Sequence, residues 1–119
     1  MSRTYKVLTV RQPWAQLIID GIKPVENRTW QTDYRGPLLI HAAAKVCRKT
    51  IEQFDLNPDE LPFGAIIGAV ELTDIVTRHR SPFFTGPFGW VLKRPRAVRP
   101  VPLRGQLKLY EATLNLRRS

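Results

Sequence analysis

Apolar positions in the first thirty residues follow first the spacing of a strand and then the spacing of a helix. Apolar residues concentrate over 6–10, which predicts a strand. The next ones recur every three or four positions and predict a short helix over 13–21 with one buried face. Pro13 suits the first helical position, and Gly21 suits the left-handed backbone at a helix C-terminus. From Pro24 onward the chain is expected to be extended.

Beyond residue 30, short apolar segments alternate with turn-forming Gly and Pro. The pattern predicts a buried strand over 38–42, a helix over 45–54 and the longest strand over 65–75. Gly68 inside that last strand indicates a bulge or bend. Further extended segments are expected, in order, over 89–92, 96–102 and 110–116. Prolines in the second of these exclude a helix and a central strand there. Five or six strands with two or three helices predict a single α+β domain over 1–119, built as a small mixed β-barrel.

Charge adds a functional indication that the apolar pattern lacks. The chain of 119 residues carries a net charge of +9. From Lys93 onward there are eight basic residues against one acid, and the basic ones are Lys93, Arg94, Arg96, Arg99, Arg104, Lys108, Arg117 and Arg118. Such a surface suits a polyanion, most often nucleic acid, and Arg suits phosphate geometry. The alternative is charge that serves solubility alone. If nucleic acid binds, we expect phosphate contacts from Arg78, Arg80, Lys93, Arg94 and Arg96.

Composition argues against several classes of protein. No apolar run approaches the ~20 residues of a membrane span, and no signal peptide is evident. The one cysteine, Cys47, cannot form an internal disulfide, which favours a reducing cytoplasm. Together with His41 and His79 it makes no spaced ligand set, so we expect neither a metal nor a cofactor. A Walker-type loop and a Ser-His-Asp arrangement are also missing from the sequence.

Three charged residues follow the first helix closely. Glu26 and Arg28 are two positions apart and share one face of the expected strand, just after Lys23. One interpretation is a surface ion pair on an exposed edge strand, with none of the three needed to fill a core. Another is a catalytic set of Lys23, Glu26 and Glu71, in which a desolvated lysine acts as a general base. Because a nearby carboxylate favours the charged ammonium, the same residues can equally form an ion-pair network that binds a ligand.

Three further side chains carry two interpretations each. His41, at a strand end, is either a general base or a hydrogen-bonded structural residue. Trp14 and Trp90 are either core residues or stacking platforms at the rim of a basic cleft, as base recognition uses them.

Five segments in order resemble the ASCH domain family, the activating signal cointegrator 1 homology domain. Gly21 to Arg28 matches its GxKxxExR motif, and Val10 to Ala15 is similar to its RQPWA lead-in. The other three are Ile40 to Ala43, Gly86 to Leu92 and Pro100 to Gly105, similar to its IHA, GPYGWVL and PxPxxG segments. The resemblance runs from about Leu8 to Glu111.

This resemblance implies a PUA-like fold, with a helix beside a cleft that meets RNA or a nucleotide-like ligand. Lys23, Glu26 and Arg28 would line that cleft, and Glu71 would reach in from the long strand. Its walls would be Gln12, Trp14, His41 and Lys45.

Relatives in this family differ in activity, which leaves three functions open. The leading expectation is binding of RNA, a nucleotide-like ligand or single-stranded DNA, in an oligomeric state the sequence does not give. An enzyme is the alternative: a metal-independent ribonuclease or an amidohydrolase on a modified nucleoside. The branch that hydrolyses N4-acetylcytidine has a threonine nucleophile three residues after the lysine, where this chain has Glu26. The third function is an accessory domain that binds a protein or nucleic-acid partner.

Overall fold

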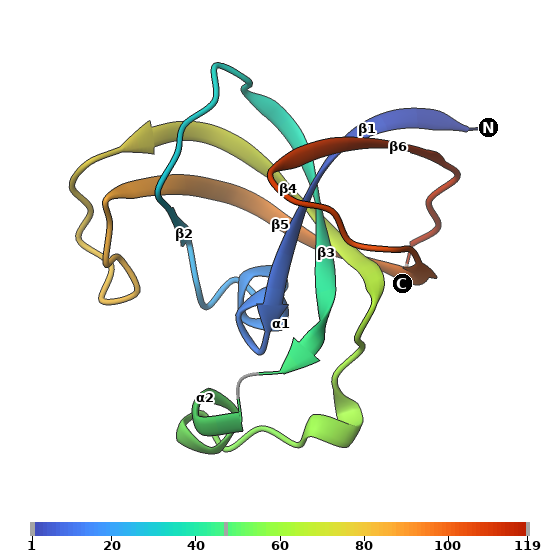
Figure 1. Cartoon of the computed structure of the whole chain (residues 1–119), viewed down its shortest axis with the longest axis horizontal. Coiled ribbons are helices and arrows are strands. Elements are labelled where there is room, and N and C mark those ends of the chain that lie inside the picture. The colour runs from blue at the N-terminus through green and yellow to red at the C-terminus, as the bar shows by residue number, and fades with distance from the viewer. Residues whose placement is uncertain (1, 47, 119) are drawn as a thin grey trace.

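A single six-stranded sheet organises the chain (Figure 1). The computed structural model describes residues 2–46 and 48–118, so the prediction for Cys47 lies outside the described residues. The elements in order are β1 (Arg3–Gln12), α1 (Trp14–Ile19), β2 (Val25–Arg28), β3 (Gly36–Val46), α2 (Arg48–Gln53), a 3₁₀ turn η1 (Pro58–Glu60), β4 (Ala65–Val76), β5 (Phe88–Pro102) and β6 (Leu109–Leu114). The predicted α+β class, strand number and helix number are confirmed.

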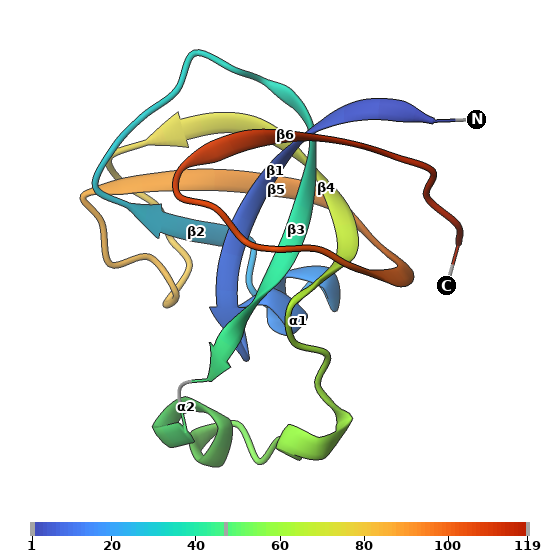
Figure 2. The same cartoon turned by 45° about the vertical axis from the view of Figure 1, so that its right-hand side comes forward.

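The order of the strands places the two ends of the sheet at β2 and β6. Strands run in the order β2-β5-β4-β3-β1-β6, with β1 and β3 parallel and every other pair antiparallel. Figure 2 shows how strongly the sheet curves. Within 2–46 and 48–118 no ladder joins β2 to β6, so the sheet stays open. The predicted barrel is therefore only an approximate description.

Helix α1 ends in a hydrogen-bonded turn that fixes the course of the next residues. The N–H of Gly21 donates to the C=O of Ile18 (3.1 Å), and the N–H of Ile22 donates to the C=O of Leu17 (3.0 Å). This pair of backbone hydrogen bonds requires a residue in the left-handed conformation. Gly21 adopts it, with φ +80°, as predicted. Pro13 lies one position earlier than predicted, as the residue that caps the helix.

The long hairpin of β4 and β5 contains the predicted irregularity at Gly68. The register shifts between Ile66 and Gly68, where the chain also passes very close to α1. A Cβ at Gly68 would lie 2.4 Å from Cδ1 of Ile19 and 2.6 Å from the C=O of Arg96. Only a residue without a side chain therefore fits between helix and strand.

The proline-rich half of β5 lacks a partner strand on one side, as the prolines predicted. β2 pairs only with 88–91, so β4 is the main partner of the rest of β5. The proline-rich half of β5 has one further backbone contact, in which the N–H of Arg99 donates to the C=O of Arg117 near the end of the chain (2.9 Å). The second helix is shorter than predicted and begins at Arg48, because β3 continues to Val46.

Trp90 is a core residue, so its predicted role at a ligand site is wrong. It is 0% exposed, and its ring meets Trp30 edge-on with centroids 4.8 Å apart. Its indole N–H donates to the C=O of Trp30 (3.3 Å), which satisfies the one polar atom of the ring. Residues of every strand except β2 enter this cluster beside α1 or a second cluster on the opposite face, which includes Val7 and Tyr110.

Replacing Trp90 should test this assignment. Trp90→Ala removes a fully buried aromatic ring and should lower the free energy of unfolding by about 3–5 kcal/mol. Leu107→Ala, at a side chain that is 92% exposed, should change it by less than about 0.5 kcal/mol. Denaturant unfolding of both variants measures the difference, and equal stabilities would show that Trp90 does not support the core.

Candidate functional site

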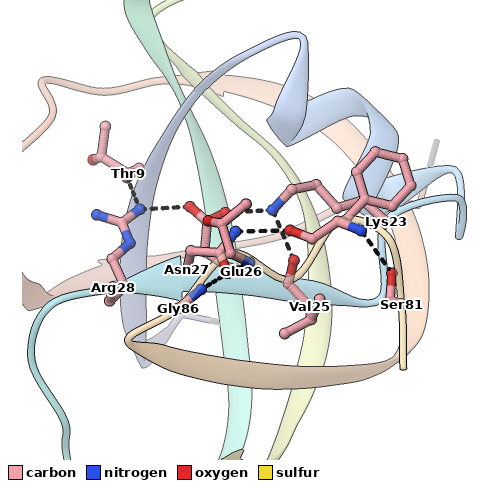
Figure 3. A network of polar contacts seen from close by, with 10 residues as sticks. Thr9, Lys23, Val25, Glu26, Asn27, Arg28, Ser81 and Gly86 are labelled. Carbon is pink, nitrogen blue, oxygen red and sulfur yellow. Dashed lines mark hydrogen bonds and ion pairs between the residues drawn. The ribbon is translucent and has the colours of Figure 1, made fainter. Parts of the chain in front are cut away.

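The three motif charges form one hydrogen-bonded network that is withdrawn from solvent (Figure 3). Lys23 is 4% exposed and Glu26 is 8% exposed. The Lys23 ammonium donates to Oε1 of Glu26 (2.5 Å) and to the C=O of Val25 (2.7 Å). Arg28 donates from Nη2 to Oε2 of Glu26 (2.9 Å). The surface ion pair considered from the sequence is therefore wrong, because the Glu26 carboxylate is buried between two cations.

Backbone geometry explains why these side chains meet. The N–H of Lys23 donates to the C=O of Leu17 (3.0 Å), so the turn after α1 aims Lys23 back toward the sheet. Glu26 and Arg28 then alternate onto the same face of β2. Nη2 of Arg28 also donates to the C=O of Thr9 in β1 (2.9 Å). This contact links β2 to a strand that is not its neighbour in the sheet and holds the open side together.

Asn27 points the other way and fixes the loop between β4 and β5 (Figure 3). Its Nδ2 donates to the C=O of Phe83 (2.9 Å). Its Oδ1 accepts from the N–H groups of Thr85 (2.8 Å) and Gly86 (3.1 Å). One amide side chain thus sets the position of the whole 83–86 segment, including the Phe83 side chain.

A cleft of about 890 Å³ opens above the charged network. Lys23, Glu26 and Arg28 lie among its lining residues. Its aromatic wall consists of Trp14, Phe54 and Phe83, with Trp14 edge-on to Phe54 (5.8 Å) and to Phe83 (6.1 Å). The Lys23 ammonium lies 5.7 Å from the centroid of the Trp14 ring. Arg11 and Lys108, both exposed, bring further positive charge to the cleft.

Of the residues predicted for a site, the cleft brings together Trp14, Lys23, Glu26 and Arg28. Gln12 lies elsewhere and is 0% exposed. Its side chain accepts from the N–H of Gln16 (2.9 Å) and donates to the C=O of Pro62 (2.9 Å), so it is a structural residue.

His41 is also a hydrogen-bonded structural residue. Nδ1 lies 3.1 Å from Oγ1 of Thr9, and Nε2 lies 2.5 Å from the C=O of Leu103. The Thr9 hydroxyl also contacts the Tyr110 hydroxyl (2.8 Å), and burial raises the pKa of Tyr110 above its usual 10.0. His41 and Lys45 line a second, smaller cavity instead of the cleft.

The predicted catalytic trio is not assembled, because Glu71 does not line the cleft. Glu71 pairs with Lys93 in the β4–β5 ladder and lies near Tyr34. Burial, and then the charge of Glu71, raise the pKa of Tyr34. The five residues predicted to contact phosphates are exposed but do not line the cleft either: Arg78, Arg80, Lys93, Arg94 and Arg96. His79, between Arg78 and Arg80, is half-buried.

Sequence reasoning missed Asn27, Phe54, Phe83 and Arg11. Asn27 occupies a variable position of the motif, directly after Glu26, and is the one polar residue among the variable positions. That polar residue was a usable signal for a role at the site. Phe83 stands in a segment expected to be irregular, and Phe54 ends a separate helix-like segment. Nothing local in the sequence indicates that these two rings stack 5.9 Å apart.

Neither a metal-ligand cluster nor a membrane-spanning helix is present in the part of the chain that the structure describes. Within 2–46 and 48–118 no group of three His, Cys, Asp or Glu side chains is placed to hold a metal ion. None of the helices there is long and apolar enough to span a bilayer.

Comparison with known proteins agrees with the motifs. The family model of the ASCH domain matches residues 8–85. Activating signal cointegrator 1 of Homo sapiens is 31% identical to this chain over an alignment 125 residues long. The alignment spans 87% of this chain and 22% of that protein. The Mus musculus protein of the same name is 29% identical with the same coverage. This chain therefore spans only 22% of the length of these curated relatives.

Solved structures share the fold. ASCH from Zymomonas mobilis superposes with a TM-score of 0.62 at 18% identity, covering 93% of this chain and 87% of that one. A mutant form of the same protein gives a TM-score of 0.60 at 18% identity, covering 95% and 91%. At this identity the likeness is evidence for the fold alone.

The charged network should respond unequally to loss of its members. Glu26→Gln leaves the buried Lys23 and the half-buried Arg28 without a counter-ion and should lower the free energy of unfolding by about 3–5 kcal/mol. Lys23→Met keeps the apolar stem and leaves Glu26 paired with Arg28, so it should cost less. Denaturant unfolding compares the two variants.

The exposed pair of Lys6 and Glu111 (3.8 Å) supplies the control for this comparison. Lys6→Met should change stability by less than about 1 kcal/mol. A Glu26→Gln variant as stable as Lys6→Met would show that the network does not hold β2 in place.

Proposed function

This chain belongs to the ASCH domain family, and from that membership and the geometry of the cleft we propose that it binds single-stranded RNA. The cleft encloses one nucleotide, and the surrounding cations contact the phosphates. Family membership supports a nucleic-acid-related function in general; the choice of single-stranded RNA and of this cleft is our proposal.

The observation that carries the proposal is the pairing of an aromatic wall with a charged floor in one cleft. Trp14 and Phe83 offer ring surfaces for a base, and stacking on such rings is worth about 1–3 kcal/mol per base. Lys23 and Arg28 offer donors at the floor. A base that enters the cleft thus meets groups suited to its face and to its edge.

Charge on the floor favours an anionic ligand further. Two cations, Lys23 and Arg28, face a single carboxylate, so the network keeps one excess positive charge. Arg11 and Lys108 add to it at the cleft. The cations predicted from the sequence do not line the cleft, and we propose that they contact the phosphates of a longer strand: Arg78, Arg80, Lys93, Arg94 and Arg96.

Hydrolysis is the weaker alternative because the obvious reacting groups are occupied. Glu26 stands at the position of the nucleophilic threonine of deacetylating relatives, and both of its oxygens accept hydrogen bonds. Glu71, the other acid of the predicted trio, lies outside the cleft. A protein partner instead of RNA is the accessory-domain alternative.

Binding of a single-stranded RNA oligonucleotide should depend on salt and on the aromatic wall. The logarithm of the association constant should fall linearly with the logarithm of salt concentration, through counterion release. Phe83→Ala should weaken binding by about 1–3 kcal/mol, or about 5- to 150-fold, because a stacking surface is lost. Fluorescence anisotropy measures both effects.

Phe84→Ala is the matched control, since Phe84 stands in the same loop and does not line the cleft. It should bind RNA as the wild type does. Affinity that is flat with salt, or equal in both phenylalanine variants, would contradict the proposal. RNA fragments found by mass spectrometry after incubation would favour the ribonuclease alternative.

A further inference from the structure

A second cavity of about 340 Å³ lies beside the cleft and shares part of its wall. Thr9, Arg11 and Ala43 line both. The second cavity extends from these residues to Lys45 at the end of β3 and to Arg104 before β6. A chain-like ligand that leaves the cleft on this side passes directly into it.

Three cations gather at this cavity without acidic partners. Arg11, Lys45 and Arg104 all line it and are all exposed. In the described part of the chain none of them forms an ion pair, and no Asp or Glu lines the cavity. Like charges held around one hollow repel one another, and an anion bound between them relieves that repulsion.

The walls of the cavity are held in place by side chains that do not need a ligand. His41 is fixed at both ring nitrogens, by Thr9 and by the C=O of Leu103. Gly105 packs against this pair so closely that a Cβ would lie 3.1 Å from Cε1 of His41. The second cavity therefore lies where small residues, among them Ala43 and Gly105, surround the fixed imidazole of His41.

Size and lining limit what this cavity can hold. His41 supplies the only ring among the described lining residues, and its two nitrogens are already engaged. The cavity thus offers cations and aliphatic walls but no free surface on which a second base can stack. Phosphate and sugar fit this chemistry better than a base.

We propose that the second cavity binds the phosphodiester group that follows the nucleotide held in the cleft. The inference rests on the proposed function and adds to it a defined path for the strand, from the aromatic wall across Arg11 to Lys45 and Arg104. Arg11, which lines both hollows, contacts the strand at the crossing point.

Adenosine and the dinucleotide ApA separate the two sites. Adenosine tests the cleft alone, whereas ApA also carries the phosphodiester group. The double variant Lys45→Gln/Arg104→Gln should bind adenosine with the wild-type affinity and ApA more weakly. Because ApA carries one phosphodiester charge, its binding should also depend less on salt in the double variant than in the wild type. Calorimetry or NMR titration measures both affinities.

The double variant Arg3→Gln/Lys49→Gln is the charge-matched control, because Arg3 and Lys49 are exposed and line neither cavity. A dinucleotide in the cleft should bind this variant as it binds the wild type. Inorganic phosphate should compete with ApA and leave adenosine binding unchanged, which distinguishes the phosphate site from the base site.

Each outcome decides between the two proposals. If wild type binds adenosine and ApA, but Lys45→Gln/Arg104→Gln loses no more ApA affinity than Arg3→Gln/Lys49→Gln, the second cavity is not a phosphate site while the cleft still binds nucleotides. Equal loss of adenosine and ApA in Lys45→Gln/Arg104→Gln also overturns the inference. If wild type binds neither ligand, the proposed function fails and the inference with it.

Discussion

The rest of this structure depends on the ion pairs that the buried carboxylate of Glu26 forms with Lys23 and Arg28. Taking ions out of water is costly, and close partners must offset that cost. Here Lys23 and Arg28 each bond one oxygen of the carboxylate, and each bonds a backbone carbonyl as well. Through the contact of Arg28 with Thr9 the network draws β2 toward β1 across the open sheet. The same network thus bridges the open side of the sheet and forms the floor of the cleft.

Much of the fold was predictable because the relevant signals are local. Gly21 takes the left-handed backbone that ends α1, and Gly68 stands at a register shift where a side chain would collide with Ile19. Pairing between distant strands was not predictable in this way. Apolar alternation shows which residues face a core, but it does not show that the sheet stays open or that β1 lies between β3 and β6.

The candidate site was predictable to the extent that its motif is contiguous. Lys23, Glu26 and Arg28 come together because a turn and one strand face suffice to place them. Trp90 and Glu71 were assigned to the site from their residue types, and the packing of β5 and β4 placed them elsewhere. The cleft wall depends on a contact over 56 residues, between Asn27 and Phe83, which no local pattern encodes.

The pairing of the first strand with the last has a consequence for the order in which the domain assembles. Thr4 and Thr113 share a hydrogen bond across 109 residues, so β1 gains its outer partner only when the end of the domain has left the ribosome. Contacts of such high sequence separation slow folding. Gln106, Leu107 and Lys108, which immediately precede β6, complete the cleft. A partly synthesised chain therefore has the motif but not the finished cleft, which is completed late and together with the sheet.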